Sequence, residues 1–329
     1  MKHLSILVPD DQTTMSTVAC IVGAFQVFTE ANRAARRNAF KVELVSAVKG
    51  AVLTQGMMSV VSHVAIDEVK KTDLVIIPAS LVRSYDKATK HNRLLIDWVA
   101  SQHHAGAEVA SMCAGCFMLA ATGILEGRIC STHWALSDEF RELYPDVQLQ
   151  TDRLITDENG IYTNGGAYSF LNLLMYLVEK FYDRSTALHC AKYFQVDMGR
   201  DMQAEFSIFS GYKKHTDDLV LDAQQFVERN YQEKMSFEQL SSTLGTSRRN
   251  FDRRFIKATG FNPLDYLQRV RVEAAKKQLE ATRKTVNEVM YEVGYNDPRA
   301  FREVFNRITG LSPLEYKLKY NKENSLLSI

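Results

Sequence analysis

The side chains with the clearest chemistry lie in two short segments of the last hundred residues, where Arg, Asn and carboxylates alternate with pairs of Phe. The two Phe of each pair are four residues apart, so they would share one buried side of a helix. The positions then expected to face outward are Arg248, Arg249, Asp252, Arg253 and Lys257 in the first segment and Arg299, Arg302, Glu303, Asn306 and Arg307 in the second. In the major groove of DNA, Arg pairs with guanine, Asn with adenine and carboxylates with cytosine. The pattern therefore predicts contacts with duplex DNA from Arg248, Arg249, Asp252, Arg253, Arg299, Arg302, Glu303 and Asn306.

The two segments belong to an internal repeat with an offset of fifty residues. Arg249, Phe251, Phe255, Thr259, Gly260, Pro263, Leu264 and Tyr266 recur as Arg299, Phe301, Phe305, Thr309, Gly310, Pro313, Leu314 and Tyr316. These identities exceed what helical periodicity alone would produce. A single basic helix is usually a solvated charged face, whereas two matched basic helices favour nucleic-acid binding.

Local signals in each repeat predict two helices joined by a turn. Each first helix would start at a capping box and end at a glycine, and each second helix would start at an N-cap residue. These residues are Ser236, Gln239, Gly245 and Ser247 in the first pair, and Thr285, Glu288, Gly294 and Asp297 in the second. Residues 263–281 should form one connecting helix, about 28 Å long at 1.5 Å per residue. Such a strut would present both second helices to successive major grooves, about 34 Å apart.

Cys113 is the residue outside the repeats whose surroundings predict reactivity. Residues 108–117 have the pattern of a buried strand that turns sharply into a helix through Ala114 and Gly115, which would place Cys113 at the carboxyl edge of a parallel sheet. Amides at the start of that helix would lower the pKa of the thiol, and His133 could approach it from downstream. Cys113 and Cys116 lack a second pair of ligands, so we expect no metal and no cofactor.

The arrangement of these motifs predicts an α/β domain followed by an all-α domain. Strand patterns at 4–8, 42–48, 74–77 and 108–112 alternate with helical patterns at 20–36 and 93–103, which is typical of a parallel sheet covered by helices. A hairpin is expected at 154–162 and a helix at 166–181. We expect domains at 1–205 and 217–320, a linker at 206–216 and a tail at 321–329.

Composition and charge agree with this division. The chain has 329 residues and a formal net charge of +1, but residues 213–329 carry 21 Lys and Arg against 16 Asp and Glu, so the basic excess lies in the second domain. The five cysteines are odd in number and scattered, which fits a reducing cytoplasm rather than a disulfide framework. The longest uncharged stretch, 109–125, is too short for a membrane span.

Residues 217–320 resemble the DNA-binding domain of the AraC/XylS family. The resemblance covers both repeats and includes the run from Gly294 to Phe301 and the closing run from Thr309 to Pro313. It implies that bases are contacted by Arg249, Asp252 and Arg253 in the first unit and by Arg299, Arg302 and Glu303 in the second. Asp252 and Glu303 depart from the Gln or Arg expected at their positions, so the preferred bases stay open.

The elbow at Cys113, with the run from Cys130 to Trp134, resembles the ThiJ/PfpI superfamily, whose fold is that of class I glutamine amidotransferases. The resemblance covers residues 1 to about 200 and implies a sensor or dimerisation module. Related enzymes have an acidic residue before the first helix, where Cys20 aligns, and a histidine after the cysteine, where Ala114 stands. We therefore expect no catalysis, and a ligand pocket formed by Cys20, Cys113, Ala114, Gly115 and His133.

Taken together, these patterns predict a cytoplasmic, DNA-binding transcriptional regulator that a small-molecule effector modulates. The expected partners are duplex DNA, a second copy of the chain in a homodimer, and RNA polymerase, with no membrane. The alternative is a cysteine-dependent hydrolase or amidase with an appended DNA-binding domain.

Overall fold

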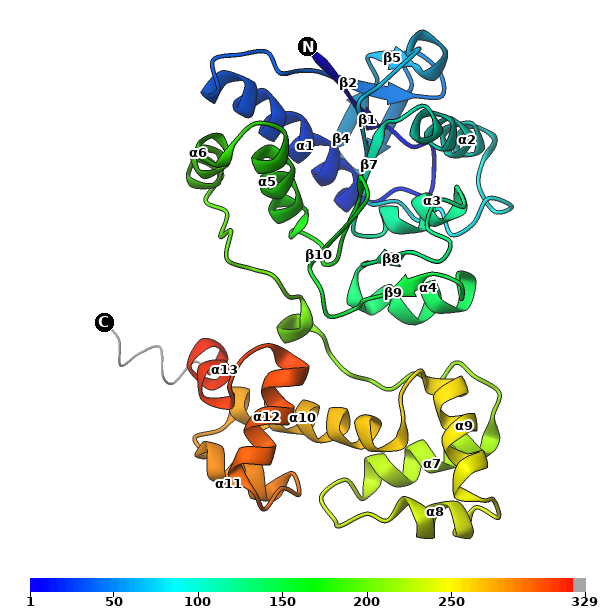
Figure 1. Ribbon diagram of the computed structural model, residues 1–329, viewed down its shortest axis with the longest axis vertical. Coiled ribbons are helices and arrows are strands. Elements are labelled where there is room, and N and C mark those ends of the chain that lie inside the picture. The colour runs from blue at the N-terminus through cyan, green and yellow to red at the C-terminus, as the bar shows by residue number, and fades with distance from the viewer. Residues whose placement is uncertain (322–329) are drawn as a thin grey trace. The chain divides into compact units, whose positions relative to one another are not determined.

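The structure, a computed structural model, describes residues 1–321; residues 322–329, most of the expected tail, lie outside the described part. The chain forms two compact units, the first being Met1–Gln203 and the second beginning at Ala204 (Figure 1). Each unit has its own hydrophobic core, and they are described in turn.

The first unit is built on a seven-stranded sheet with the order β10-β11-β7-β6-β1-β2-β5. Neighbouring strands are parallel except for the hairpin of β10 and β11, whose turn lies at Asn159 and Gly160 as the sequence predicts. The strands of the sheet are β1 (Lys2–Leu7), β2 (Phe40–Ser46), β5 (Val64–Ala65), β6 (Leu74–Ile77), β7 (Glu108–Met112), β10 (Ile155–Glu158) and β11 (Ile161–Asn164). Leu4 of β1 lies opposite Val42 of β2 and Leu74 of β6, which places three apolar residues in register at the centre of the sheet.

Helices cover both faces of this sheet, so the predicted α/β class is confirmed (Figure 1). On one face lie α1 (Met15–Ala34), α5 (Phe170–Phe181) and α6 (Arg184–Phe194), and on the other α2 (Lys90–His104) and α3 (Gly115–Ala121). The smaller elements of the unit are β3 (Val52–Gln55), β4 (Met58–Val61), η1 (Ile66–Glu68), β8 (Ile129–Cys130), η2 (Trp134–Leu136), α4 (Ser137–Leu143) and β9 (Gln148–Leu149). The sequence analysis did not predict these short elements or α6.

Helix α1 begins five residues before the predicted start at Cys20. Thr14 is its N-cap residue, and the Thr14 amide donates to the Thr17 hydroxyl at 2.9 Å. The expectation that Cys20 precedes the first helix is therefore wrong, because Thr14 and Thr17 start the helix one turn earlier.

Within its described residues, the second unit contains helices and no strand. It contains η3 (Ala204–Phe206), α7 (Asp218–Arg229), α8 (Phe237–Thr243), α9 (Arg248–Thr259), α10 (Pro263–Ala281), α11 (Val286–Glu292), α12 (Pro298–Thr309) and α13 (Pro313–Tyr320). One apolar cluster surrounds Phe251 and Phe255, and a second surrounds Phe301 and Phe305, with α10 contributing to both. The predicted connecting helix 263–281 matches α10 at both ends.

The caps of the helical pairs follow the sequence signals with one exception. The Thr285 and Glu288 side chains form the reciprocal capping box, with bonds of 3.2 and 2.6 Å. At the first pair, the Ser236 hydroxyl accepts from the Gln239 amide, but no bond returns from the Gln239 side chain. The reciprocal half of the Ser236 capping box was predicted wrongly, because Gln239 does not reach back to the Ser236 amide.

Candidate functional site

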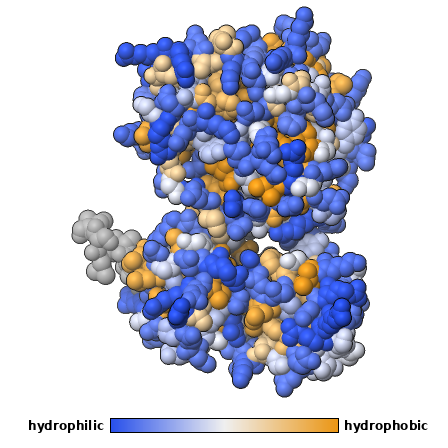
Figure 2. Space-filling model, viewed as in Figure 1, coloured by the Kyte–Doolittle hydropathy of each residue, from blue (hydrophilic) through white to orange (hydrophobic). Residues whose placement is uncertain are grey.

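The second helix of each pair, α9 or α12, buries its two Phe and exposes its basic side. Phe251, Phe255, Phe301 and Phe305 are each at most 1% exposed. Among the predicted contact residues, Arg249, Arg253, Arg299, Arg302, Glu303 and Asn306 are exposed, and Arg248 and Asp252 are half-buried. Figure 2 shows mostly hydrophilic side chains on the visible face of this unit, with smaller hydrophobic patches between them. The buried stripe thus orients each helix and leaves its polar side in solvent.

Charged side chains on these helices differ in how freely they can move. The Arg248 Nε lies 2.8 and 2.9 Å from the two carboxylate oxygens of Asp252, and its guanidinium stacks on the Phe237 ring at 5.6 Å. On α12, Arg299 pairs with Glu303 at 2.9 Å. Arg302 makes no ion pair with any residue in the range 1–321. Arg248 and Arg299 therefore each have a carboxylate partner on their own helix, while Arg302 extends into solvent.

Arg307 faces outward as predicted, and it also joins the two helical pairs. Its guanidinium donates to Asp265 at 3.0 Å and to Gln268 at 2.7 Å, both on α10. The Arg307 side chain is 51% exposed, so these bonds leave part of it in solvent.

Two further sets of contacts join the helical pairs, one through Arg271 of α10 and one at Gly294. Arg271 donates to the backbone oxygens of Tyr231 at 2.7 Å and Glu233 at 2.9 Å, and its guanidinium lies over the Tyr295 ring at 5.2 Å. The turn glycine of the second pair, Gly294, has φ of +85°, and a Cβ there would lie 2.5 Å from the backbone oxygen of Gln232. The second pair can approach the loop that follows α7 this closely only because position 294 has no side chain.

In the first unit, Cys113 sits on a strained elbow between β7 and α3. Its φ is +52°, a conformation that non-glycine residues rarely adopt. The Cys113 amide donates to the backbone and side-chain oxygens of Asn164 at 3.1 and 3.2 Å, and the Thr132 hydroxyl donates to the Cys113 carbonyl at 3.1 Å. A Cβ on Gly115 would lie 2.6 Å from the Pro78 oxygen, so glycine is required for the elbow to pack on β6. The predicted elbow is therefore present and held by three hydrogen bonds to the Cys113 backbone.

The environment of the thiol is opposite to the one predicted. Cys113 is 6% exposed, and burial raises the pKa of its thiol to about 11, although a bond from the Ala114 amide acts in the other direction. Cys20 lies beside it, and burial raises the pKa of the Cys20 thiol to about 12. The expectation of a lowered pKa is wrong because the cost of removing the thiolate from water exceeds the stabilisation from the helix amides.

His133 is near the elbow but is not arranged as a base for Cys113. Its Nδ1 accepts from the Ala135 amide at 3.1 Å, and its ring lies 5.4 Å from that of Trp134. Burial lowers the pKa of this imidazole, so the neutral form dominates at pH 7. With Nδ1 occupied as an acceptor, the proton of the neutral ring belongs on Nε2. Cys20, Cys113, Ala114 and Gly115 are thus buried, and His133 is half-buried and follows Thr132, whose hydroxyl donates to the Cys113 carbonyl.

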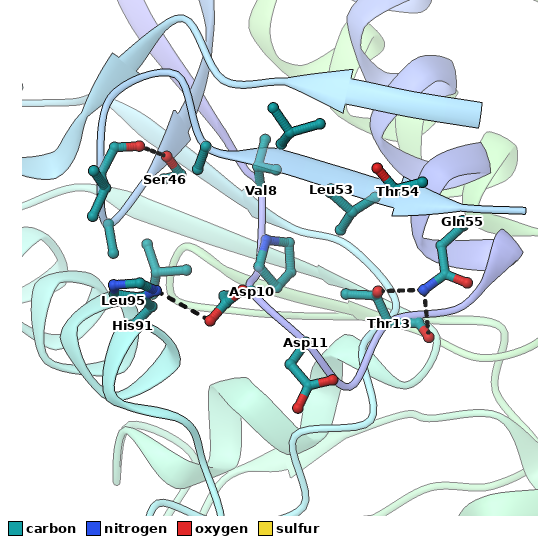
Figure 3. A pocket seen from close by; sticks show the side chains of 15 residues that line it. Val8, Asp10, Asp11, Thr13, Ser46, Leu53, Thr54, Gln55, His91 and Leu95 are labelled. Atoms are coloured by element: carbon teal, nitrogen blue, oxygen red, sulfur yellow. Dashed lines mark hydrogen bonds and ion pairs between the residues drawn. The ribbon is translucent and has the colours of Figure 1, made fainter. Parts of the chain in front are cut away.

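A cavity of about 490 Å³ lies at the carboxyl edge of the sheet, beyond the ends of β1 and β2. Figure 3 shows Val8, Leu53 and Leu95 around it, with the carboxylates of Asp10 and Asp11 on the loop that follows β1. Asp10 pairs with His91 of α2 at 3.1 Å, and its amide donates to Asn92 at 2.9 Å. The lining of the cavity is therefore mixed, with apolar side chains, hydroxyl and amide groups, and a carboxylate that has one ionisable partner.

The sequence analysis did not propose this cavity. The available signal was the run Pro9-Asp10-Asp11 directly after the first strand, since ligands of parallel sheets bind at the carboxyl ends of strands. The opposite wall comes from β3, a short strand that the sequence pattern did not reveal. In the range 1–321, no group of three or more His, Cys, Asp and Glu side chains is placed to hold a metal ion. No helix of that range is long and apolar enough to cross a membrane.

Comparison with known proteins matches both units. Residues 23–180 match the DJ-1/PfpI family, and residues 240–319 match a helix-turn-helix domain. The chain thus carries an N-terminal DJ-1/PfpI domain and a C-terminal helix-turn-helix domain of the AraC type. The helix-turn-helix domain lies in the unit that contains α9 and α12, and the DJ-1/PfpI domain lies in the unit that contains the elbow and the cavity.

Two curated relatives align with nine tenths of the chain at low identity. The HTH-type transcriptional regulator CdhR of Pseudomonas aeruginosa is 23% identical over 90% of this chain and 87% of its own length. GbdR of the same species is 21% identical over 90% of this chain and 80% of its own. Among solved structures, a putative transcriptional regulator from Vibrio parahaemolyticus covers 58% of this chain and 98% of its own with a TM-score of 0.51 at 22% identity, and Drosophila melanogaster DJ-1beta covers 60% and 98% with 0.50 at 16%. The structural matches show the fold of the DJ-1/PfpI half.

Proposed function

We propose that this regulator binds specific sites on duplex DNA by placing α9 and α12 in two successive segments of the major groove. The observation that carries the proposal is the pairing of two capped helix-turn-helix units, each with a buried Phe pair behind an exposed basic side. Base contacts are assigned to Arg248, Arg249, Asp252, Arg253, Arg299, Arg302, Glu303 and Asn306. Helix α10 spans about 28 Å, near the rise of one duplex turn, so one chain can reach two groove segments.

The experiment selects the preferred DNA sequence for the full chain and then compares Arg302→Ala with Arg229→Ala. Both arginines are exposed in the helical unit, but Arg229 lies on α7, outside both recognition helices. Arg302→Ala should weaken the selected site by about 1–3 kcal/mol and relax the preference at one base position. The control should leave the base preference intact. An unchanged base preference in Arg302→Ala would remove this residue from base recognition.

We propose that a small-molecule effector binds in the cavity that Val8, Asp10, Leu53 and Leu95 line at the carboxyl edge of the sheet. The carboxylate favours a ligand with a cationic or hydrogen-bond-donating group, while Val8, Leu53 and Leu95 favour an apolar remainder. A ligand found by thermal-shift screening of small metabolites should lose its shift in Asp10→Asn and keep it in Asp67→Asn, an exposed carboxylate outside the cavity. An equal shift in both variants would place the effector elsewhere, with the elbow at Cys113 as the next candidate.

We propose that Cys113 has a regulatory role and catalyses no reaction. The raised thiol pKa, the low exposure of the sulfur and the occupied Nδ1 of His133 all support it, because a nucleophilic cysteine needs a thiolate and a base within reach. The hydrolase alternative predicts amide turnover that Cys113→Ala abolishes. Mass spectrometry of the full chain with amide substrates, before and after this substitution, decides between them.

Further parts of the proposal concern assembly and location. We propose a cytoplasmic homodimer that contacts RNA polymerase when bound to DNA. Exposed apolar side chains on α1 and α6, namely Met15, Val22, Leu188 and Tyr193, support a contact of the first unit with a second copy. Light scattering of the full chain measures the oligomeric state, and replacing Tyr193 with Asp should shift it toward the monomer.

A further inference from the structure

The segment from Ala204 to Asp217 runs along the helical unit and contacts helices of both helix-turn-helix pairs. At its beginning, η3 packs against α12, the second recognition helix. The Glu205 carboxylate, 10% exposed, accepts from Lys319 of α13 at 2.7 Å and from the Tyr320 hydroxyl at 3.1 Å. The sequence analysis assigned most of this segment to a linker, but its first residues are fixed to the second helix-turn-helix unit.

The middle of the segment is bonded to a buried ion pair on α10. Lys276 and Glu273 pair at 3.0 Å with side chains only 6% and 10% exposed. The Lys276 ammonium also donates to the backbone oxygen of Ser207, and Glu273 accepts from the Phe209 amide at 3.2 Å. Burying two charges costs free energy unless further hydrogen bonds satisfy them, and here the backbone of the segment supplies those bonds.

The next residues pack on the start of α10. The Phe209 ring makes edge contacts with Phe261 at 5.9 Å and Tyr266 at 5.2 Å. Gly211 has φ of +68°, and a Cβ there would lie 2.1 Å from the Tyr266 hydroxyl oxygen. The segment can pass over this tyrosine only because residue 211 is glycine.

The end of the segment is attached to the first helix-turn-helix unit. Gln224 of α7 donates to the Tyr212 carbonyl at 2.8 Å. The carboxylate of Asp217 receives two bonds from Arg254 of α9, at 2.8 and 2.5 Å, and also caps α7 at the Val220 amide. Since Arg254 lies on the first recognition helix, the segment contacts α12 at its beginning and α9 at its end.

We infer that the segment 204–217, called the splint below, fixes the spacing and relative rotation of the two recognition helices. Lys276 and Glu273 are then positioning residues for the recognition of specific DNA sites. The fourteen residues from Ala204 to Asp217 would reach at most about 50 Å if fully extended, which exceeds the roughly 28 Å of α10, so the segment is long enough to bridge both helix-turn-helix units. The inference rests on the proposed DNA-binding function and adds residues that the base-contact set does not contain. It also extends the DNA-binding machinery back to Ala204, before α7.

The test uses the full chain with Lys276→Met and, as a matched control, Lys277→Met, which changes an exposed lysine one position along α10. Each variant is titrated against the selected DNA site and against the same site with about 5 bp, half a duplex turn, inserted between its two recognised segments. Wild-type protein should prefer the uninterrupted site by at least about tenfold. This preference should fall by at least about threefold in Lys276→Met and stay unchanged in Lys277→Met. Circular dichroism confirms folding.

A purely stabilising role for Lys276 would lower binding to both DNA sites equally and leave their ratio unchanged, and that result would overturn the inference. If Lys276→Met does not fold, Glu205→Gln removes the charged end of the splint at α13 and should lower the same ratio. An unchanged ratio in Glu205→Gln also overturns it. Failure of the wild-type chain to prefer any DNA sequence would instead overturn the proposed function on which the inference rests.

Discussion

The two turn glycines of the repeat offer a matched pair of substitutions that differ in one contact. Gly245 and Gly294 both have positive φ, +69° and +85°, so alanine is strained at either position. A Cβ at Gly245 meets nothing within 4 Å, whereas at Gly294 it would lie 2.5 Å from the Gln232 oxygen and 2.9 Å from an Arg271 nitrogen. The difference between the two variants therefore isolates the contact of the second helical pair with the loop that follows α7.

The expected loss of stability in each variant is the sum of backbone strain at positive φ and, at Gly294, steric overlap with the Gln232 oxygen. An L-residue in the left-handed region costs about 1–2 kcal/mol, which both variants incur. Forcing a methyl group against a packed backbone oxygen adds about 1–3 kcal/mol. Gly245→Ala should thus lower the stability of the helical unit by about 1–2 kcal/mol, and Gly294→Ala by about 2–5 kcal/mol.

Hydrogen exchange with mass spectrometry, measured at increasing urea concentration on the full chain, is the suitable assay. Both tryptophans, Trp98 and Trp134, lie in the first unit, so their fluorescence does not report on the helical unit. Peptides from α11 and α12 give the free energy of opening of the second pair, and peptides from α8 and α9 that of the first. If the two alanine variants cost the same within about 0.5 kcal/mol, the close approach of Gly294 to Gln232 does not constrain the fold.

Three further outcomes are expected. Burial raises the pKa of the Cys113 thiol to about 11, against an ordinary value of about 8.5. Alkylation of Cys113 at pH 7.5, followed by peptide mass spectrometry, should therefore be at least about 100-fold slower in the native chain than in urea. Equal rates would contradict the buried elbow. The Arg254 guanidinium lowers the pKa of the Asp217 carboxyl, so the stabilisation lost in Asp217→Asn, about 1–2 kcal/mol, should be constant above about pH 5 and shrink as the pH falls below about 4, the unfolded-state value. Urea titrations between pH 7 and 2.5 measure this difference, and a difference that does not shrink over this range would argue against the ion pair. Insertion of about 5 bp between the two recognised DNA segments should weaken binding of the wild-type protein by more than about 1 kcal/mol, as measured by fluorescence anisotropy. An insertion of about 10 bp returns both segments to the same side of the duplex but separates them by more than α10 can span. A loss of less than about 1 kcal/mol at half a turn would mean that only one unit recognises bases.

The features that the sequence determined are those in which the interacting residues lie close together along the chain. The Phe pairs at i and i+4, the caps at Ser247, Thr285 and Asp297, and the turn at Gly294 fix the recognition helices through contacts within one helical turn. The fifty-residue repeat then showed that the unit occurs twice. The alternation of strands and helices likewise predicted the parallel sheet, because side-chain periodicity differs between the two elements.

Only the tertiary structure decided which charges are free and which are buried. The sign of the pKa shift at Cys113 depends on how completely the surrounding chain excludes water, and no local pattern contains that quantity. Arg307 turns back to α10 across 42 residues of sequence, and Lys319 reaches Glu205 across 114. The splint at 204–217 lacks the periodicity of a long helix or a strand, and many of its partners lie on helices far along the chain, namely α9, α10, α12 and α13. Local spacing specifies hydrogen bonds between neighbouring residues, whereas burial and long-range pairing arise only when the whole chain has packed.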